Sequence, residues 1–196
     1  VEVLRAVDDL VRAGKVLHFA FSDTPAWVIG YALAKAEDFG WSRPCAVQVP
    51  YSLSGRSIER EIKPLTEAHG LSLLPWGVLD AGTLTGKYND PNNTEAKRNS
   101  SIGERELAMG QAVVDIAATV GASPAHVALA WVRQQGANII PILGVRKVSH
   151  LEDNLGCLDV TLSAEQLDSL NALSAFRPEY PMGFLMREYV RGLTFG

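Results

Sequence analysis

Residues 71–88, LSLLPWGVLDAGTLTGKY, form the stretch that determines how the chain can fold. The stretch begins with a short apolar run, residues 71–74, which predicts a buried β-strand. Pro75 ends this run, and three glycines are then spread through a loop that closes with Lys87. A strand that opens into a glycine-bearing loop with a terminal cation lets the backbone approach a phosphate closely. Because glycine also marks any tight loop, the stretch predicts either a phosphate-binding loop or an ordinary turn.

Composition indicates an ordinary globular protein. The chain has 196 residues, of which 47% are hydrophobic and 20% charged, and its net charge is −4. We therefore expect one domain over residues 1–196 with enough chain for a substantial core. The mild acidity and the lack of a basic run give no support for nucleic-acid binding, and no apolar segment predicts a membrane span.

The two cysteines, Cys45 and Cys157, have no short spacing between them, which suits a reducing compartment better than a disulfide framework. We therefore expect a cytoplasmic protein, and no metal-ligand set is predicted. The chain opens with Val1 inside a helical pattern, so we also expect a further segment upstream.

Short apolar runs alternate with amphipathic segments along the chain. Strands are predicted at residues 16–21, 46–49, 71–74 and 139–143. Helices are predicted at residues 1–13, 25–40, 57–69, 104–120, 124–132, 148–155 and 164–173. Thr24, Ser57, Ser123 and Ser163 are expected to cap helices, the last of them in a capping box with Gln166. His18 lies inside the first predicted strand, where we expect it to be packed. The tail from residue 174 is expected to lie irregularly across the body.

The alternation of strands and helices predicts a parallel sheet in an α/β fold. No Gly-x-Gly-x-x-Gly pattern follows a strand, which argues against a Rossmann domain. Polar residues follow each predicted strand, at residues 22–23, 48–51, 76–87 and 144–147. Polar groups at the carboxyl ends of successive strands are typical of the top face of a (β/α)₈ barrel, which has eight strands. Four strands make half of such a barrel and leave two open edges.

Five segments carry a resemblance to a known family: residues 14–27 (GKVLHFAFSDTPAW), 47–53 (VQVPYSL), 75–88 (PWGVLDAGTLTGKY), 123–132 (SPAHVALAWV) and 141–155 (PILGVRKVSHLEDNL). In this order and spacing the chain resembles the C-terminal half of an aldo-keto reductase. The resemblance implies the C-terminal half of a TIM barrel, with four parallel strands, crossover helices, an extra C-terminal helix and a tail. It also implies a chain that carries the NADP(H)-binding segments of an enzyme that transfers a hydride to a small-molecule carbonyl substrate.

The resemblance implies a cofactor site along the strand exits. Ser22, Asp23 and Gln48 match the residues that hold the nicotinamide carboxamide. Tyr51 or Trp76 is expected to pack near the nicotinamide. The implied pyrophosphate contacts are Gly77, Val78, Leu79 and Ala81 from the loop, with Lys87 and Arg98 as cations. The implied contacts to the adenosine and its 2′-phosphate are Gly144, Arg146, His150, Asp153 and Asn154.

Several residues depart from the family pattern. Asp23 replaces the commoner Asn, so it can accept but not donate a hydrogen bond to the carboxamide. Gly77 replaces a Ser and Val78 replaces a Pro in the pyrophosphate loop. Asp80 adds a negative charge beside this loop, which is expected to weaken cofactor binding unless the carboxylate points away.

The family's catalytic tetrad of Asp, Tyr, Lys and His belongs to the N-terminal half, so no catalytic residue is expected in this chain. Three readings stay open. The chain is part of a complete aldo-keto reductase, whose activity without the other half is doubtful. Alternatively, it is a non-catalytic half-barrel that binds a nucleotide and dimerises through its open sheet edges. A redox-sensing subunit without catalysis is the third reading.

Overall fold

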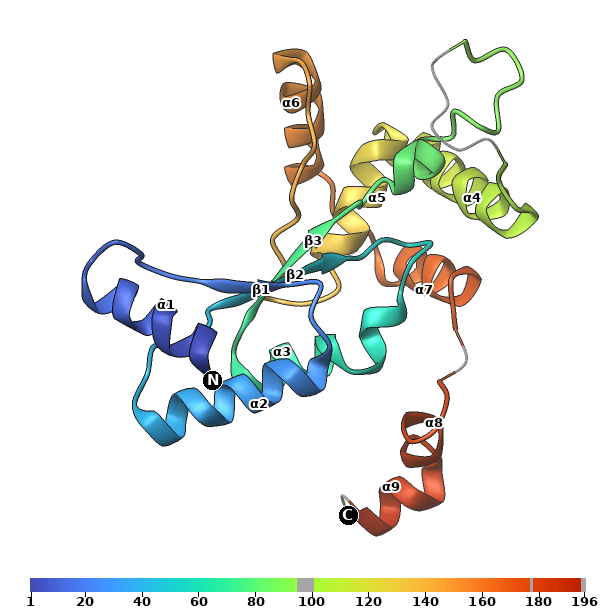
Figure 1. The fold of residues 1–196 in the computed structure, drawn as a ribbon. Coiled ribbons are helices and arrows are strands. Elements are labelled where there is room, and N and C mark those ends of the chain that lie inside the picture. Colours follow the sequence, from blue (N-terminus) through green and yellow to red (C-terminus); the bar gives the residue numbers. More distant parts are fainter. Residues whose placement is uncertain (95–100, 177, 195–196) are drawn as a thin grey trace.

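The computed structural model describes residues 1–94, 101–176 and 178–194 (Figure 1). The strands are β1 (Ala20–Ser22), β2 (Ala46–Pro50) and β3 (Ser72–Trp76). The α-helices are α1 (Glu2–Arg12), α2 (Ala26–Phe39), α3 (Ile62–His69), α4 (Glu104–Val120), α5 (Pro124–Arg133), α6 (Val148–Leu155), α7 (Ala164–Leu173), α8 (Met182–Leu185) and α9 (Glu188–Thr194). Short 3₁₀-helices are η1 (Ser57–Arg60), η2 (Asp80–Thr85) and η3 (Gly156–Leu158).

The strands form a parallel sheet in the order β1-β2-β3, which confirms the α/β class. Ser22 pairs with Gln48 in register, and Gln48 pairs with Leu74. Strands that follow each other in sequence are therefore neighbours in space, as in a barrel, and the order does not reverse as in a doubly wound sheet. All three carboxyl ends lie at one edge of the sheet.

The expected fourth strand is not formed as a strand within the described residues. Residues 139–143 run parallel to β3 but make only an isolated bridge between Leu73 and Ile139. Ile140 N–H donates to Leu73 O at 2.9 Å, and Ile142 N–H donates to Pro75 O at 2.7 Å. Pro75, which lies between these two bonds on β3, has no N–H to donate to the carbonyl of Ile140, so the ladder is interrupted there.

The first strand is shorter than predicted. It begins at Ala20, and the preceding Leu17 is 80% exposed. His18 is also exposed, so the expectation that it is packed was wrong. Among the described residues β1 pairs only with β2, so no second strand covers the residues that lead into it.

The two faces of the sheet have different environments. On one face Val47, Val49 and Leu73 are fully buried against the helices. The apolar residues 127–132 of α5 are buried in the same core. On the opposite face Ser22 and Gln48 share a register position and stay at least partly accessible to solvent. The described helices therefore cover one face of the sheet well and leave the other open.

Two of the four predicted helix caps are formed. Ser123 caps α5, and Ser163 forms the predicted capping box of α7. Thr24 was expected to cap α2, but its hydroxyl donates to Ser22 O at 2.9 Å and Pro25 occupies the N-cap position. Ser57 lies in η1, and α3 begins only at Ile62.

The C-terminal tail is more regular than expected. It forms α8 and α9, which project away from the sheet at the end of the chain (Figure 1). Within the described residues, no single helix has the length and apolar composition to cross a membrane, and α4 with α5 reaches that threshold only jointly, across a bend of 97°.

Candidate functional site: a cleft beside the phosphate loop

The exits of the three strands bring four of the predicted residues together. Ser22 and Gln48 lie side by side on adjacent strands, and Asp23 N–H donates to Gln48 O at 3.0 Å. Trp76, at the end of β3, is 41% exposed, and its indole N–H donates to the Asp23 carboxylate at 3.3 Å. Asp23 has a φ of 47°, a left-handed conformation that Asp adopts more readily than most residues. The amide of Gln48 makes no hydrogen bond to any described residue and is free to meet a ligand.

Tyr51 does not belong to this group. Its side chain is only 1% exposed, and its ring packs against Trp131 with centroids 5.5 Å apart. Its hydroxyl donates to Glu59 at 2.6 Å. Burial, together with this bond to a carboxylate, raises the pKa of the Tyr51 hydroxyl. Tyr51 is therefore a core residue with no face for a nicotinamide, and Trp76 is the exposed member of the pair of aromatic candidates.

The loop after β3 has the backbone of an anion-binding turn. Gly77 has a φ of 67°, and the consecutive residues Asp80, Ala81 and Gly82 have φ values of 46°, 51° and 93°. Leu79 precedes them with φ −91° and ψ 4°. A right-handed residue followed by left-handed ones turns successive N–H groups toward one concave side. The left-handed conformation costs about 1–2 kcal/mol for a residue with a Cβ, so Asp80 and Ala81 store strain of this order.

The N–H groups of this loop are available. The backbone N–H of Asp80 donates to Gly77 O, and the N–H of Gly82 donates to Leu79 O. These two bonds close the turn. No described residue accepts a hydrogen bond from the N–H of Gly77, Leu79 or Ala81. Unpartnered backbone donors on a concave turn are what a phosphate group requires.

Two side-chain contacts shape this loop, one from Lys87 and one from Ser54. Lys87 lies across Gly82 so closely that a Cβ at position 82 would lie 2.7 Å from Lys87 Nζ. Glycine is therefore favoured there by its φ of 93°, and a larger residue would also displace the flexible end of the lysine side chain. The carboxylate of Asp80 accepts a hydrogen bond from the Ser54 hydroxyl at 2.8 Å. The Ser54 hydroxyl thus stabilises the negative charge of Asp80 beside the loop.

The loop forms one wall of a cleft made of two adjoining cavities. The first, of about 500 Å³, is lined by Trp76, Gly77, Val78, Leu79, Asp80, Ala81, Gly82, Lys87, Leu129, Ile142, Leu143, Gly144 and Asn154. The second, of about 440 Å³, is lined by Leu79, Thr85, Lys87, Asn93, Ser123, Pro124, Ala125, Gly144, His150, Asp153 and Asn154. The two share Leu79, Lys87, Gly144 and Asn154. The loop of residues 77–82 and the helix α6 therefore both line one cleft.

The structure brings most, but not all, of the predicted residues into this cleft. Ser22, Asp23 and Gln48 lie outside its lining and adjoin it through Trp76. Arg146 is exposed on the segment before α6 and does not line either cavity. Arg98 lies outside the described residues.

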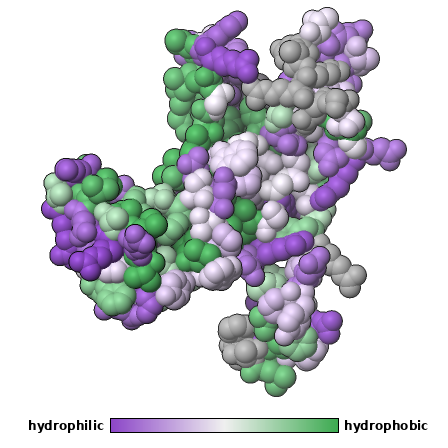
Figure 2. All heavy atoms as spheres, in the orientation of Figure 1, coloured by the Kyte–Doolittle hydropathy of each residue, from purple (hydrophilic) through white to green (hydrophobic). Residues whose placement is uncertain are grey.

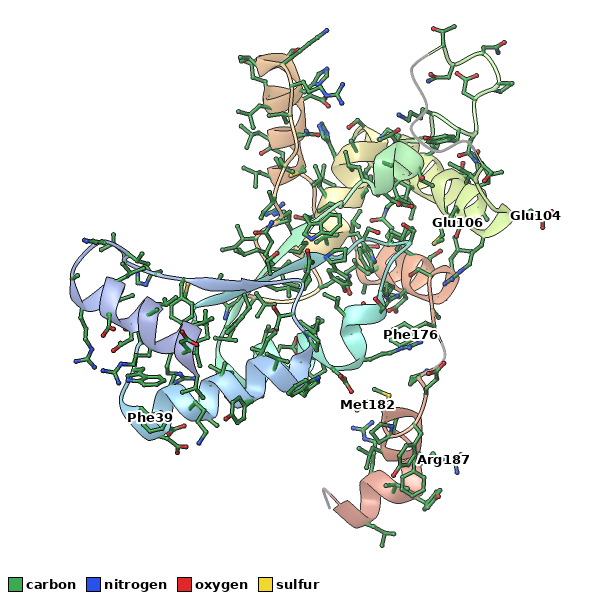
Figure 3. The ribbon with its side chains drawn as sticks, viewed as in Figure 1. Phe39, Glu104, Glu106, Phe176, Met182 and Arg187 are labelled. Carbon is green, nitrogen blue, oxygen red and sulfur yellow. The ribbon has the colours of Figure 1, made fainter. Side chains whose placement is uncertain are left out.

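A separate cavity of about 400 Å³ lies under the C-terminal tail. Its walls come from the start of α2, from η1 and α3, and from residues 179–182. In Figure 3 Met182 on α8 points back toward α2 and α3, whereas Arg187 points outward. Arg60 lines this cavity and lies 3.8 Å from Glu179. None of the residues predicted to bind the cofactor lines it.

Comparison with known proteins identifies the chain. The model of the aldo/keto reductase family matches residues 1–175. The chain belongs to the aldo/keto reductase family. Members of this family are oxidoreductases that use NADP(H). The resemblance carried by the five sequence segments is thereby confirmed.

Curated relatives of this aldo/keto reductase chain include three fungal enzymes. A norsolorinic acid reductase of Emericella nidulans is 33% identical over 187 residues, which cover 94% of this chain and 47% of the relative. A probable aryl-alcohol dehydrogenase of Saccharomyces cerevisiae is 31% identical over 192 residues, covering 94% and 58%. An aryl-alcohol dehydrogenase (NADP(+)) of Phanerodontia chrysosporium is 32% identical over 190 residues, covering 92% and 49%. The chain spans about half the length of these relatives.

The cleft fits the family's cofactor in chemistry and shape. An elongated dinucleotide needs a surface for a ring, donors for two phosphates and a second pocket for the adenosine. Trp76 offers an exposed aromatic face, the turn at residues 77–82 offers N–H groups, and Lys87 supplies a cation. The second cavity offers the carboxylate of Asp153 and the amide of Asn154. The polar groups that line the cleft therefore fit the chemistry of NADP(H).

Proposed function

We propose that this chain supplies the NADP(H)-binding part of a carbonyl-reducing oxidoreductase. The observation that carries the proposal is the continuity of the cleft. A turn with unpartnered N–H groups and a lysine lies between an exposed tryptophan at one end and the polar residues of α6 at the other. Backbone donors at the middle and polar side chains at the far end match a ligand with two phosphates and a nucleoside.

The residues of the chain bind and orient, while NADPH when bound supplies the hydride. The N–H groups of Gly77, Leu79 and Ala81, with Lys87, are proposed to hold the two phosphates. Ser22, Asp23 and Gln48 are proposed to hold the nicotinamide amide at the strand exits, next to Trp76. Because the Asp23 carboxylate only accepts hydrogen bonds, it is proposed to accept from the NH₂ group of the nicotinamide amide. The side-chain NH₂ of Gln48 is then proposed to donate to the oxygen of that amide. Holding both ends of the amide determines which face of the ring is turned to the substrate.

Arg146 is proposed to reach the 2′-phosphate from the rim of the cleft. Its side chain is exposed, so it can change rotamer without losing a packed contact. A planar guanidinium suits bidentate contact with a phosphate. His150, Asp153 and Asn154 line the second cavity and are proposed to contact the adenosine.

The proton donor is proposed to come from another half-barrel. The family's catalytic tetrad is proposed to lie outside this chain, and general acid catalysis contributes about 10²–10⁴-fold to such reactions. The open face of the sheet and the apolar stripe of α6 are surfaces on which a second half-barrel can pack. In this stripe Val148, Leu151 and Leu155 recur on one side of the helix and are exposed. Figure 2 shows hydrophobic surface along the projecting α6.

We propose that the second half is the N-terminal half of an aldo/keto reductase and that the substrate is an aryl carbonyl compound. The names of the yeast and Phanerodontia relatives support that substrate class, since both are described as aryl-alcohol dehydrogenases. A second candidate function, a non-catalytic nucleotide-binding homodimer, is favoured by the open edge of β1, which pairs only with β2 within the described residues. Sedimentation velocity separates the two: the first predicts a monomer at micromolar concentration, and the second predicts a stable dimer.

The cofactor proposal is tested by calorimetric titration of the purified chain. NADPH is expected to bind saturably at one site per chain, and NADH more weakly because it lacks the 2′-phosphate. Quenching of Trp76 fluorescence is expected to accompany binding and to be lost in Trp76→Phe. The variant Trp27→Phe is the matched control, because Trp27 is exposed on α2 and lines neither cavity. If NADPH produces no saturable heat, the proposal fails.

A further inference from the structure

The helix that carries the adenosine-side residues has an unusual attachment to the body. No residue of α6 is buried, although it supplies one wall of the cleft. Figure 1 shows α6 standing away from the sheet. Its apolar side chains therefore do not fix its distance from the phosphate loop.

Two side chains of α5 hold the end of α6 instead. His126 Nε2 lies 2.5 Å from Asp153 O. A carbonyl oxygen only accepts, so this nitrogen carries the proton and donates. Two turns further along α5, Arg133 Nη1 donates to Cys157 O at 2.7 Å. Positions 126 and 133 are two turns apart on one side of α5, and they hold carbonyls that are four residues apart at the α6–η3 junction.

The His126 side chain is mostly buried and lies in close contact with the end of α6. The His126 side chain is only 16% exposed, and Nε2 also lies 3.4 Å from a carboxylate oxygen of Asp153. A Cβ at Gly156, the C-cap of α6, would lie 2.7 Å from His126 Cε1. Gly156 has an ordinary helical φ of −57°, so this glycine is required by the close approach of the imidazole and not by backbone conformation. The imidazole therefore sits directly against the end of α6.

We infer that His126 is a positioning residue for the cofactor: it fixes α6, and with it Asp153 and Asn154, at the distance from the phosphate loop that the adenosine requires. This inference rests on the proposed NADP(H) function. His126 does not itself line either cavity. Its effect passes through the Asp153 backbone, and the neighbouring helix residues follow as a rigid unit.

The first test measures the position of α6 without any ligand. Hydrogen exchange of the amides of residues 150–156 is compared in the unmodified chain, His126→Leu and His126→Gln at one pH. The Leu variant loses the donor and is expected to exchange about fivefold faster, the equivalent of one hydrogen bond. Gln keeps an N–H donor at the end of its side chain and is expected to restore protection. His69→Leu, at an exposed histidine of α3, is the control and is expected to change nothing.

The second test measures affinity for the adenosine half alone. Calorimetry with 2′,5′-ADP is expected to show about five- to tenfold weaker binding to His126→Leu, and a recovery in His126→Gln. Circular dichroism confirms that each variant is folded. If the unmodified chain does not bind 2′,5′-ADP, the proposed function fails and this inference with it. If the unmodified chain binds but His126→Leu shows the same affinity and the same exchange, only the role of His126 is overturned.

Discussion

Arg56 is the most connected side chain of the described core, and its removal is expected to destabilise the protein strongly. Its Nε and Nη2 donate to the two oxygens of Glu59 at 2.8 and 2.9 Å. Its Nη1 donates to Ser174 Oγ at 2.8 Å, and the guanidinium lies over the Trp131 ring, 5.3 Å from the centroid. Glu59 in turn accepts from Tyr51. The network ties the exit of β2 to the end of α7.

The size of the effect follows from burial. The Arg56 and Glu59 side chains are 13% and 17% exposed. Removal of one partner from a buried ion pair costs about 3–5 kcal/mol, because the other charge stays buried without compensation. Since some water still reaches this pair, we expect the lower end, about 3 kcal/mol, for Arg56→Met. In a domain of this size that corresponds to a drop in melting temperature of roughly 6–12 °C.

The assay is urea unfolding followed by tryptophan fluorescence, with Trp131 as a buried reporter. Lys63→Met is the matched control, since it breaks the Lys63–Glu67 pair, whose carboxylate is 57% exposed, and such pairs contribute about 0–1 kcal/mol. The double variant Arg56→Met/Glu59→Gln is expected to recover part of the loss because it removes the orphaned charge. A loss below about 1 kcal/mol for Arg56→Met, or one equal to the control, would show that the Arg56–Glu59 pair is not effectively buried.

Three further outcomes are expected. Lys87→Met weakens NADPH binding about 10–100-fold in calorimetry, since a charged hydrogen bond is lost; an unchanged affinity contradicts the assignment of the loop. Gly110→Ala places a Cβ 2.8 Å from the carbonyl oxygen of Thr83 and lowers stability by about 1–3 kcal/mol in thermal melts; an unchanged melting point shows that the close approach is not real. The Ser42 N–H holds the pKa of Asp8 below its usual value, so the stability given by ionised Asp8 is full above about pH 4 and lost as pH falls. The stability difference between the unmodified chain and Asp8→Asn is therefore expected to shrink on acidification, and a constant difference contradicts this.

Local patterns predicted the elements well where neighbours in sequence decide the structure. The helices at residues 104–120 and 148–155 have the predicted bounds, and the capping box of Ser163 is formed. The strand predictions failed where tertiary context decides. Residues 16–19 were predicted to be part of a buried strand, but β1 pairs with one strand only, and Leu17 and His18 are exposed.

The site was predicted in part for a similar reason. Glycines and a lysine mark the phosphate loop in sequence, because the backbone conformation itself demands them. Tyr51 was misread as a cofactor contact because a strand exit can point either to the cleft or to the core. Contacts between distant segments, such as Ser54 with Asp80 and His126 with Asp153, leave no local pattern.

The position of bound NADP(H) on the chain can be mapped residue by residue. The isotope-labelled chain is titrated with NADP(+), and amide shifts are mapped by heteronuclear NMR. We predict the largest shifts at Gly77, Leu79 and Ala81 and along residues 144–154, with these shifts reduced in Lys87→Met. Shifts confined to the cavity under the tail, around Arg60 and Met182, or no shifts at all, would contradict the account.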